Sequence, residues 1–422
     1  MKKILYILLL ILLSCDNELE INSDWKDIPV IYSVLDSGAE FDGDGSNHSI
    51  FPLTGIVCPQ SNDFNIDGDS ENDLNTDHFV RIQKSFLGSE SALNYTNIYD
   101  SIYYNTNDLE VWATYIDCST GEESNSYPLN IIYREDLNIY NNLYKDDGLF
   151  NSDNYYLYKL PDVISGLVPN QNCNTDYKLF VLNKLTGDTA SAITNIVKPL
   201  KLYQSGFSVY NEVFEFSTLQ YEKLTLRQSD NAEKYFFTLT FHYIEQTQEG
   251  YNSDLLNGND IPTDGVSYKS FSWNIPVETV NYGTTIDFQI SSAEFFEKIN
   301  TQIITNETNN NVYRYPRYSY DGGGVPIHRC IDLKIVAVNA ELDTYINTSQ
   351  PNYGLNQETP EYNNIVNGIG HFSSRSTMVL PNFKMDNLTM NKIASDFPSL
   401  NFSCFEISAN NVYVNFGLDC VE

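Results

Sequence analysis

Short stretches of alternating apolar and polar residues recur through this chain and predict a protein built mainly of β-strands. The alternation is clear over residues 78–86, where Val80 and Ile82 fall on one face and are expected to contact the core. Similar stretches end at Asp, Ser, Thr and Gly residues, which favour turns. Strands of this kind are predicted over residues 28–35, 109–116 and 176–183.

The second half of the chain combines longer strands with short helices. Apolar residues within 291–299 recur at helical spacing, with Ser292 as the expected N-cap, and residues 341–346 predict a second helical turn. A long central strand is predicted over residues 235–244, and a further strand over residues 331–338.

The length of 422 residues exceeds what one hydrophobic core usually serves, so we expect two domains. An Ig-like or transthyretin-like β-sandwich is predicted over residues 28–200, with an Asp/Asn-rich insertion at about 41–76. Residues 201–422 are predicted to form a second β-rich domain with a few short helices. The expected fold class is therefore mainly β.

The first fifteen residues combine a basic start, an apolar run over residues 4–13 and Cys15 after a small residue. The run is too short to span a bilayer, which takes about 20 residues. The stretch that ends at Cys15 resembles a bacterial lipobox. The resemblance implies that residues 1–14 are a removed signal peptide and that Cys15 carries lipid such as palmitate. Residues 15–27 then form an acidic tether.

The charge balance narrows the range of partners. Acidic residues outnumber basic ones by 56 to 24, which leaves a formal net charge of −32. Such a field repels nucleic acid and anionic lipid headgroups, so both are disfavoured as partners. The 31 tyrosines suit half-buried strand surfaces, and an ordinary strand role is favoured over a carbohydrate-stacking surface.

Six cysteines remain once Cys15 is assigned to the lipid, and an even number outside the cytoplasm permits three disulfides. The preferred pairs are Cys118–Cys173 and Cys404–Cys420, because the partners are neighbours within one predicted domain. Free buried thiols are the alternative. The chain contains no Cys-x-x-Cys pair, so zinc binding by thiolates is not expected.

The insertion carries oxygen-bearing side chains at alternate positions, followed by a glycine. This spacing matches the first half of an EF-hand-type calcium loop, because alternation lets a tight loop direct several oxygens at one cation. Leu74 stands where such a loop has a bidentate Glu, and a solvated polar insertion is the favoured alternative. The candidate ligands are Asp63, Asn65, Asp67, Asp69 and Glu71.

The sequence contains no familiar catalytic motif. Its five histidines form no His-Glu-x-x-His pair, and no Gly-x-Ser-x-Gly, P-loop or dinucleotide-binding glycine pattern occurs. His242 lies in a predicted strand and is interpreted as a satisfied sheet residue. We therefore expect a non-catalytic protein. An extracytoplasmic hydrolase such as a glycosidase stays open, because its paired carboxylates meet only in the tertiary structure. A surface adhesion or structural protein is the third alternative.

Residues 367–372 place two glycines beside His371 and Phe372. Glycines at such positions most often let two backbones approach closely. A ligand-contacting loop is the alternative, since loops carry function disproportionately.

Several of these segments are together similar to a Bacteroidota lipoprotein family of unknown function. The similarity is carried by the Cys15 lipobox and by residues 30–35, 80–86, 177–179 and 364–372. Members are often encoded near TonB-dependent outer-membrane receptors. The acidic residues 16–20 also resemble the surface-export signal of lipoproteins in that phylum. The resemblance implies a lipid-anchored outer-membrane protein, surface-exposed rather than periplasmic-facing, with a binding or accessory role beside a β-barrel receptor. Its ligand, a small molecule or a glycan, is left unassigned.

Overall fold

The computed structural model describes residues 27–38, 77–85, 98–139, 155–167, 173–202, 213–257, 262, 264–275, 285–303, 312–320, 326–349, 362–408 and 411–416. Regular structure in these residues is mainly β-strand, in four sheets with a few short helices, which confirms the predicted fold class. The strands predicted over 109–116 and 176–183 are present with those bounds, and Val80 and Ile82 are buried.

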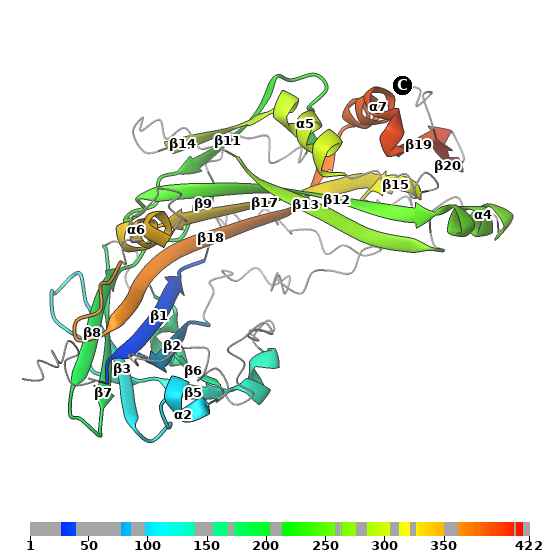
Figure 1. The fold of residues 1–422 in the computed structure, drawn as a ribbon. Helices are drawn as coiled ribbons and strands as arrows, with labels where there is room; N and C mark the ends of the chain where they lie inside the picture. Colours follow the sequence, from blue (N-terminus) through cyan, green and yellow to red (C-terminus); the bar gives the residue numbers. More distant parts are fainter. Residues whose placement is uncertain are drawn as a thin grey trace, which may run out of the picture.

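One 11-stranded sheet extends from one part of the molecule to the other (Figure 1). Along its main path β1 and β18 are parallel, and the other neighbouring strands are antiparallel. The path runs through β13 (Val266–Ile275), β12 (Lys234–Thr247), β17 (Pro326–Val338), β18 (Ile369–Met385), β1 (Pro29–Asp36), β2 (Phe79–Lys84), β6 (Tyr156–Lys159) and β5 (Asn130–Tyr133). Short strands pair off this path: β10 (Val213–Phe214) with β18, β15 (Val312–Pro316) with β12, and β16 (Tyr318–Tyr320) with β17.

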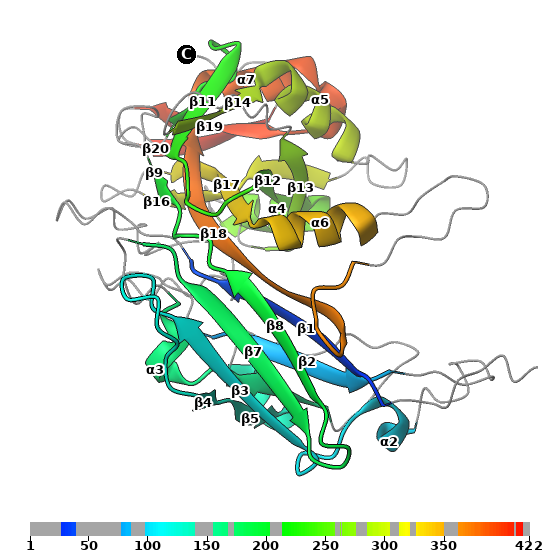
Figure 2. The same cartoon turned by 90° about the vertical axis from the view of Figure 1, so that its left-hand side faces the viewer.

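A four-stranded antiparallel sheet lies over the β1–β2 part of the large sheet (Figure 2). Alternate side chains of both sheets point inward and form a first apolar core, to which Ile31, Val80, Val111 and Leu179 belong. This part is a two-layer, sandwich-like arrangement. The strands of the smaller sheet are β4 (Tyr127–Pro128), β3 (Leu109–Ile116), β7 (Asp176–Asn183) and β8 (Thr189–Asn195).

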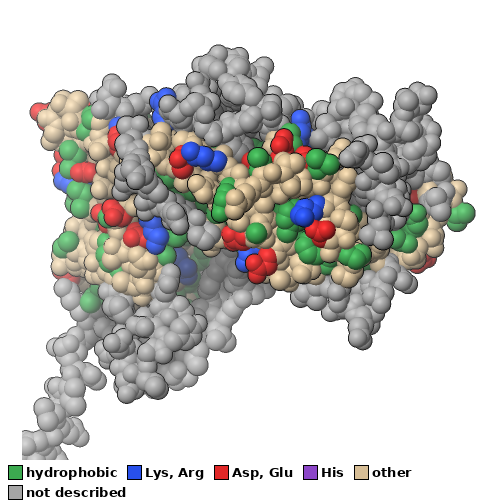
Figure 3. Space-filling model, turned by 90° about the horizontal axis from the view of Figure 1, so that it is seen from above, with side chains coloured by type: hydrophobic (Ala, Val, Ile, Leu, Met, Phe, Trp, Pro, Cys, Tyr) green, Lys and Arg blue, Asp and Glu red, His purple; other side chains and the backbone are tan. Residues whose placement is uncertain are grey.

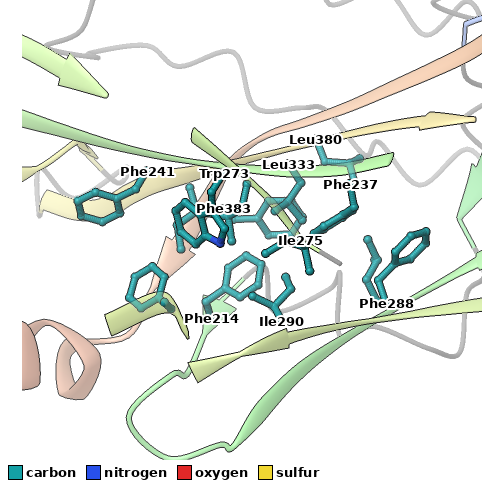
Figure 4. Packing of buried hydrophobic residues seen from close by; sticks show 14 of the residues in the cluster. Phe214, Phe237, Phe241, Trp273, Ile275, Phe288, Ile290, Leu333, Leu380 and Phe383 are labelled. Atoms are coloured by element: carbon teal, nitrogen blue, oxygen red, sulfur yellow. The ribbon is translucent and has the colours of Figure 1, made fainter. Parts of the chain in front are cut away.

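A second apolar core covers the other part of the large sheet (Figure 4). Phe237 of β12 stacks on Phe288 with ring centroids 5.1 Å apart, and Phe241 meets Phe295 edge-on at 6.0 Å. A three-stranded sheet and two helices supply the opposite wall (Figure 1). These elements are β14 (Thr285–Ser291), β11 (Tyr221–Arg227), β9 (Lys201–Leu202), α5 (Ser292–Gln302) and α7 (Asn387–Asp396).

The helix predicted over 291–299 is present as α5, but Ser292 is not its N-cap. Ser291 has extended backbone angles, and its side chain accepts a hydrogen bond from the backbone N–H of Glu294. Ser292 is already helical and donates instead to the carbonyl oxygen of Leu219. The turn predicted over 341–346 lies in α6. The remaining elements are α2 (Tyr99–Ile102), η2 (Arg134–Ile139), α3 (Asp162–Ser165), α4 (Gln248–Asn257), α6 (Ala340–Ser349), η4 (Pro398–Leu400), β19 (Ser403–Ser408) and β20 (Asn411–Phe416).

Strand β18 belongs to both cores. Phe372 packs in the first core, whereas Met378 and Leu380 pack in the second. Ile365, just before β18, also joins the first core. The first core is thus built from residues between 31 and 196 together with Ile365 and Phe372, and the second from other residues between 197 and 402. The large sheet is common to both cores.

Buried polar side chains occupy the boundary between the two cores. The Ser374 hydroxyl donates to the carbonyl oxygen of Asn195 (2.6 Å) and accepts from the N–H of Val197 (3.0 Å). Asn339, which is fully buried, donates to the Thr194 hydroxyl (2.8 Å) and accepts from the N–H of Ser374 (3.3 Å). These hydrogen bonds join β18 to β8 and offset the cost of removing the polar groups from water.

Candidate functional site

The anchor and the calcium loop predicted from the sequence lie outside the described residues. This applies to Cys15 and to Asp63, Asn65, Asp67, Asp69 and Glu71, so lipidation and calcium binding stay predictions. Within the described residues, no group of three or more His, Cys, Asp or Glu side chains is placed to hold a metal ion. In the same part of the chain, no helix is long and apolar enough to cross a bilayer.

The Cys118–Cys173 disulfide is present, as predicted. It ties the turn after β3 to the residues before β7, across a sequence separation of 55. In the chain-entropy model, closing a loop of that size stabilises a fold by about 4 kcal/mol. Cys420 lies outside the described residues, so the Cys404–Cys420 pair stays a prediction. Cys330 is a free, buried thiol whose pKa is raised by burial.

His242 lies in β12, and its Nε2 is 2.8 Å from Oδ2 of Asp332 in the adjacent strand β17. Arg317 donates to the same carboxylate. Burial by itself would raise the pKa of Asp332, but the His242 hydrogen bond and the Arg317 charge outweigh it. They hold the pKa of Asp332 well below its usual range. His242 and Arg317 thus stabilise the buried Asp332 carboxylate, which is a structural role.

Residues 367–372 form the start of β18 and its contact with β1. Gly370 has a φ of +116°, and a Cβ at this position would lie 2.0 Å from the carbonyl oxygen of Ile31, its partner in β1. The next residue, His371, packs against the rings of Tyr345 and Tyr32, with centroids 4.0 and 5.5 Å away. This segment therefore allows the close backbone approach that its glycines predict.

A cavity of about 360 Å³ opens where α2 and η2 meet the β5 end of the large sheet. Tyrosine rings form much of its wall, and an amide, a hydroxyl and a carboxylate complete it. The lining residues are Tyr99, Asn105, Thr106, Tyr133, Glu135 and Tyr155.

The pairing of two strands brings the tyrosines of this cavity together. Tyr133 ends β5 and Tyr155 immediately precedes β6, which pairs antiparallel with β5. Tyr99 lies in α2, where its ring stacks on Tyr103 with centroids 5.2 Å apart. Tyr103 and Tyr155 pack together with Leu137 in a small buried cluster. Packing within the fold thus holds Tyr99 and Tyr155 in place.

The residues that line the cavity range from buried to exposed. Tyr155 is 6% exposed, whereas Tyr133 is 44% exposed at the surface. Burial, with smaller effects from Tyr103, Asp100 and Tyr133, raises the pKa of Tyr99, so this phenol is neutral at physiological pH. Among the described lining residues, Glu135 is acidic and none is basic.

Charges on another face of the molecule are mixed. In Figure 3, acidic and basic side chains lie in small groups beside one another, with hydrophobic and polar atoms between them. Pairs such as Lys223–Asp287 (2.8 Å) and Lys392–Asp396 (3.0 Å) come from β11, β14 and α7, which lie on that side of the molecule (Figure 1). This face offers no single-sign patch among the described residues.

No pattern along the chain predicts the cavity. The available signal was the local density of tyrosines, including the pairs at 103–104 and 155–156. Alternation assigns such residues to strands but does not say which of them share a pocket, because that depends on strand pairing.

Comparison with protein-family models, curated proteins and solved structures finds no match for this chain.

Proposed function

We propose that this protein is held at the outer membrane by lipid on Cys15 and has a non-catalytic binding role, with the tyrosine-lined cavity as its binding site. The cavity is the observation that carries the proposal, because a concave aromatic wall with a few polar groups is the usual form of a small-ligand site. Among the described lining residues Glu135 is the one carboxylate, whereas glycoside hydrolysis uses two carboxylates about 5–10 Å apart, so these residues fit a binding role better.

Two observations support the proposed location. The Cys118–Cys173 disulfide is typical of an oxidising compartment outside the cytoplasm. The apolar run that ends at Cys15 has the length and flanking residues of a removable leader rather than of a membrane span. The acidic residues 16–20 support the surface-exposed orientation through their resemblance to an export signal.

Membrane fractionation of a Cys15→Ser variant tests the anchor. The variant should move from the membrane to the soluble fraction and should no longer incorporate labelled palmitate, because stable anchoring of a soluble body depends on its acyl chains. The matched control is the double variant Cys118→Ser/Cys173→Ser, which removes two other thiols and should stay in the membrane fraction. Membrane retention of Cys15→Ser would refute the anchor.

A β-barrel receptor of the TonB-dependent type is the proposed partner, on the strength of the family resemblance. Affinity purification of the tagged full-length protein from solubilised outer membranes should recover such a receptor in stoichiometric amount. Recovery of the protein alone would contradict the accessory role. The ligand-binding role is tested by a separate experiment.

A further inference from the structure

We propose that the tyrosine-lined cavity binds a neutral sugar ring of an oligosaccharide. This inference rests on the proposed binding function and names the ligand class of the same site. It depends on three properties of the described lining residues: three of them are tyrosines, two others carry an amide and a hydroxyl, and none of them is basic.

The rings suit the apolar face of a pyranose. A pyranose presents C–H groups on its faces and hydroxyls around its edge, so it suits a lining that combines tyrosines with polar side chains. Tyr99 is held by its stack on Tyr103, and Tyr155 is fixed in the small buried cluster. Tyr133, 44% exposed, is placed at the mouth, where a ring of the ligand can cover it.

The polar groups suit the hydroxyls of a sugar. The Asn105 side-chain oxygen accepts a hydrogen bond from the N–H of Asn107 (3.2 Å), which directs its amide group and leaves the two amide hydrogens for a ligand. Thr106 can both donate and accept, and the Glu135 carboxylate is a strong acceptor for a hydroxyl pair. These three side chains therefore supply the donors and acceptors that a polyhydroxylated ring requires.

Other ligand classes fit the lining less well. An anion would meet the Glu135 carboxylate and no basic side chain among the lining residues that the structure describes, in a chain of net charge −32. A wholly apolar ligand would strip water from Asn105, Thr106 and Glu135 without replacing its hydrogen bonds. A quaternary ammonium ion would use the rings and the carboxylate but leave the amide and the hydroxyl unpaired.

The size of the cavity limits what enters it. About 360 Å³ lies at the lower end of the range of about 300–1,000 Å³ for ligand sites. One or two rings of an oligosaccharide are therefore enclosed, and the rest of the chain extends past Tyr133 into solvent.

The experiment uses the full-length protein in a detergent without a sugar headgroup. An array of neutral oligosaccharides of glucose, galactose, mannose and N-acetylglucosamine is screened, and the strongest binder is measured by calorimetry. Tyr133→Ala should weaken its binding roughly tenfold or more, because a stacking ring is lost. Tyr133→Phe should retain more affinity than Tyr133→Ala. The matched control is Tyr221→Ala in β11, another exposed tyrosine (49%), which should bind as the wild type does.

Tetramethylammonium and an acidic oligosaccharide complete the set of probes. If tetramethylammonium binds in a Tyr133-dependent way and neutral sugars do not, the sugar inference is overturned and the binding function survives. If none of the probes shows Tyr133-dependent binding, both fail. Neutral-sugar binding that Tyr133→Ala leaves unchanged would place the sugar elsewhere and also overturn the inference.

Discussion

His371 occupies a buried position in which a charged imidazole would have to lose its water. It is 5% exposed, packs against Tyr345 and Tyr32, and lies 3.2 Å from the Ser373 hydroxyl through Nδ1. Burial lowers the pKa of His371 to about 4. A second histidine, His78, is likewise buried, and its pKa is lowered mainly by desolvation. Both side chains are therefore neutral in the folded protein near neutral pH.

This neutrality predicts loss of stability in mild acid. Above about pH 6.5 neither state binds the proton of His371, whereas below it the unfolded chain binds that proton and the folded chain does not. The free energy of unfolding should therefore fall by about 2 kcal/mol between about pH 7.5 and about pH 5 on account of His371 alone. Urea unfolding of the wild type and of His371→Gln at both pH values measures it.

The difference between wild type and variant isolates this contribution, because His78 and the carboxylates titrate in both proteins. His371→Gln should lose less stability on acidification than the wild type does. Equal losses in the two proteins would show that His371 accepts its proton without unfolding.

At the scale of elements, the most constrained contact is the parallel pairing of β1 with β18. Ile31 lies opposite Gly370, whose φ of +116° brings its Cα close to the Ile31 carbonyl. Beyond it, Asp36 at the end of β1 accepts hydrogen bonds from Arg375 (2.7 Å) and from the Thr377 hydroxyl (2.6 Å) of β18. The pairing therefore depends on Gly370, which has no side chain, at one end and on the buried carboxylate of Asp36 at the other.

Gly370→Ala should displace β1 from β18. The added Cβ would lie 2.0 Å from the Ile31 oxygen, which is backbone and cannot move without its strand. We expect a loss of about 4 kcal/mol or more, or no folded protein. Gly121→Ala is the control, because Gly121 also has a positive φ (+72°) but has no heavy atom within 4 Å of the added Cβ. That change should cost about 1–2 kcal/mol.

Urea midpoints of the two glycine variants provide the comparison. If Gly370→Ala and Gly121→Ala lose equal stability, the loss comes from backbone strain alone. The close approach of β1 to β18 would then not require a glycine at position 370.

At the scale of the whole molecule, the two cores depend on one strand. β18 supplies Phe372 to the first core and Met378 to the second, and it lies beside β1 in the large sheet. The polar layer around Asn339 and Ser374 joins the same strand to β8. The amino-terminal part is therefore completed by residues from the far end of the sequence.

A fragment of residues 16–200 should consequently fail to fold. Without β18, one edge of β1 loses its hydrogen bonds, and the first core loses Ile365 and Phe372. The amide NMR spectrum of the fragment should show little dispersion, whereas the full chain should show a well-dispersed one. A dispersed spectrum from the fragment would mean that the first core is an independent domain.

Several local features of this protein are predictable from its amino-acid sequence. Alternation located the strands at 109–116 and 176–183, helical spacing located α5 and α6, and neighbouring cysteines indicated the Cys118–Cys173 bond. These features depend on contacts within or near one stretch of chain, so short patterns contain them. A short sequence pattern does not distinguish Ser291 from Ser292 as the N-cap, because either serine can accept the hydrogen bond.

Which strands are neighbours is known only from the folded structure. Asp36 and Arg375 are 339 residues apart in sequence, and alternation within β1 or β18 does not specify its partner. The tyrosine-lined cavity has the same origin, because Tyr99, Tyr133 and Tyr155 meet only after β5 pairs with β6 beside α2. Periodicity directs a side chain toward one face of its strand, whereas strand pairing and packing bring side chains from distant segments into one site.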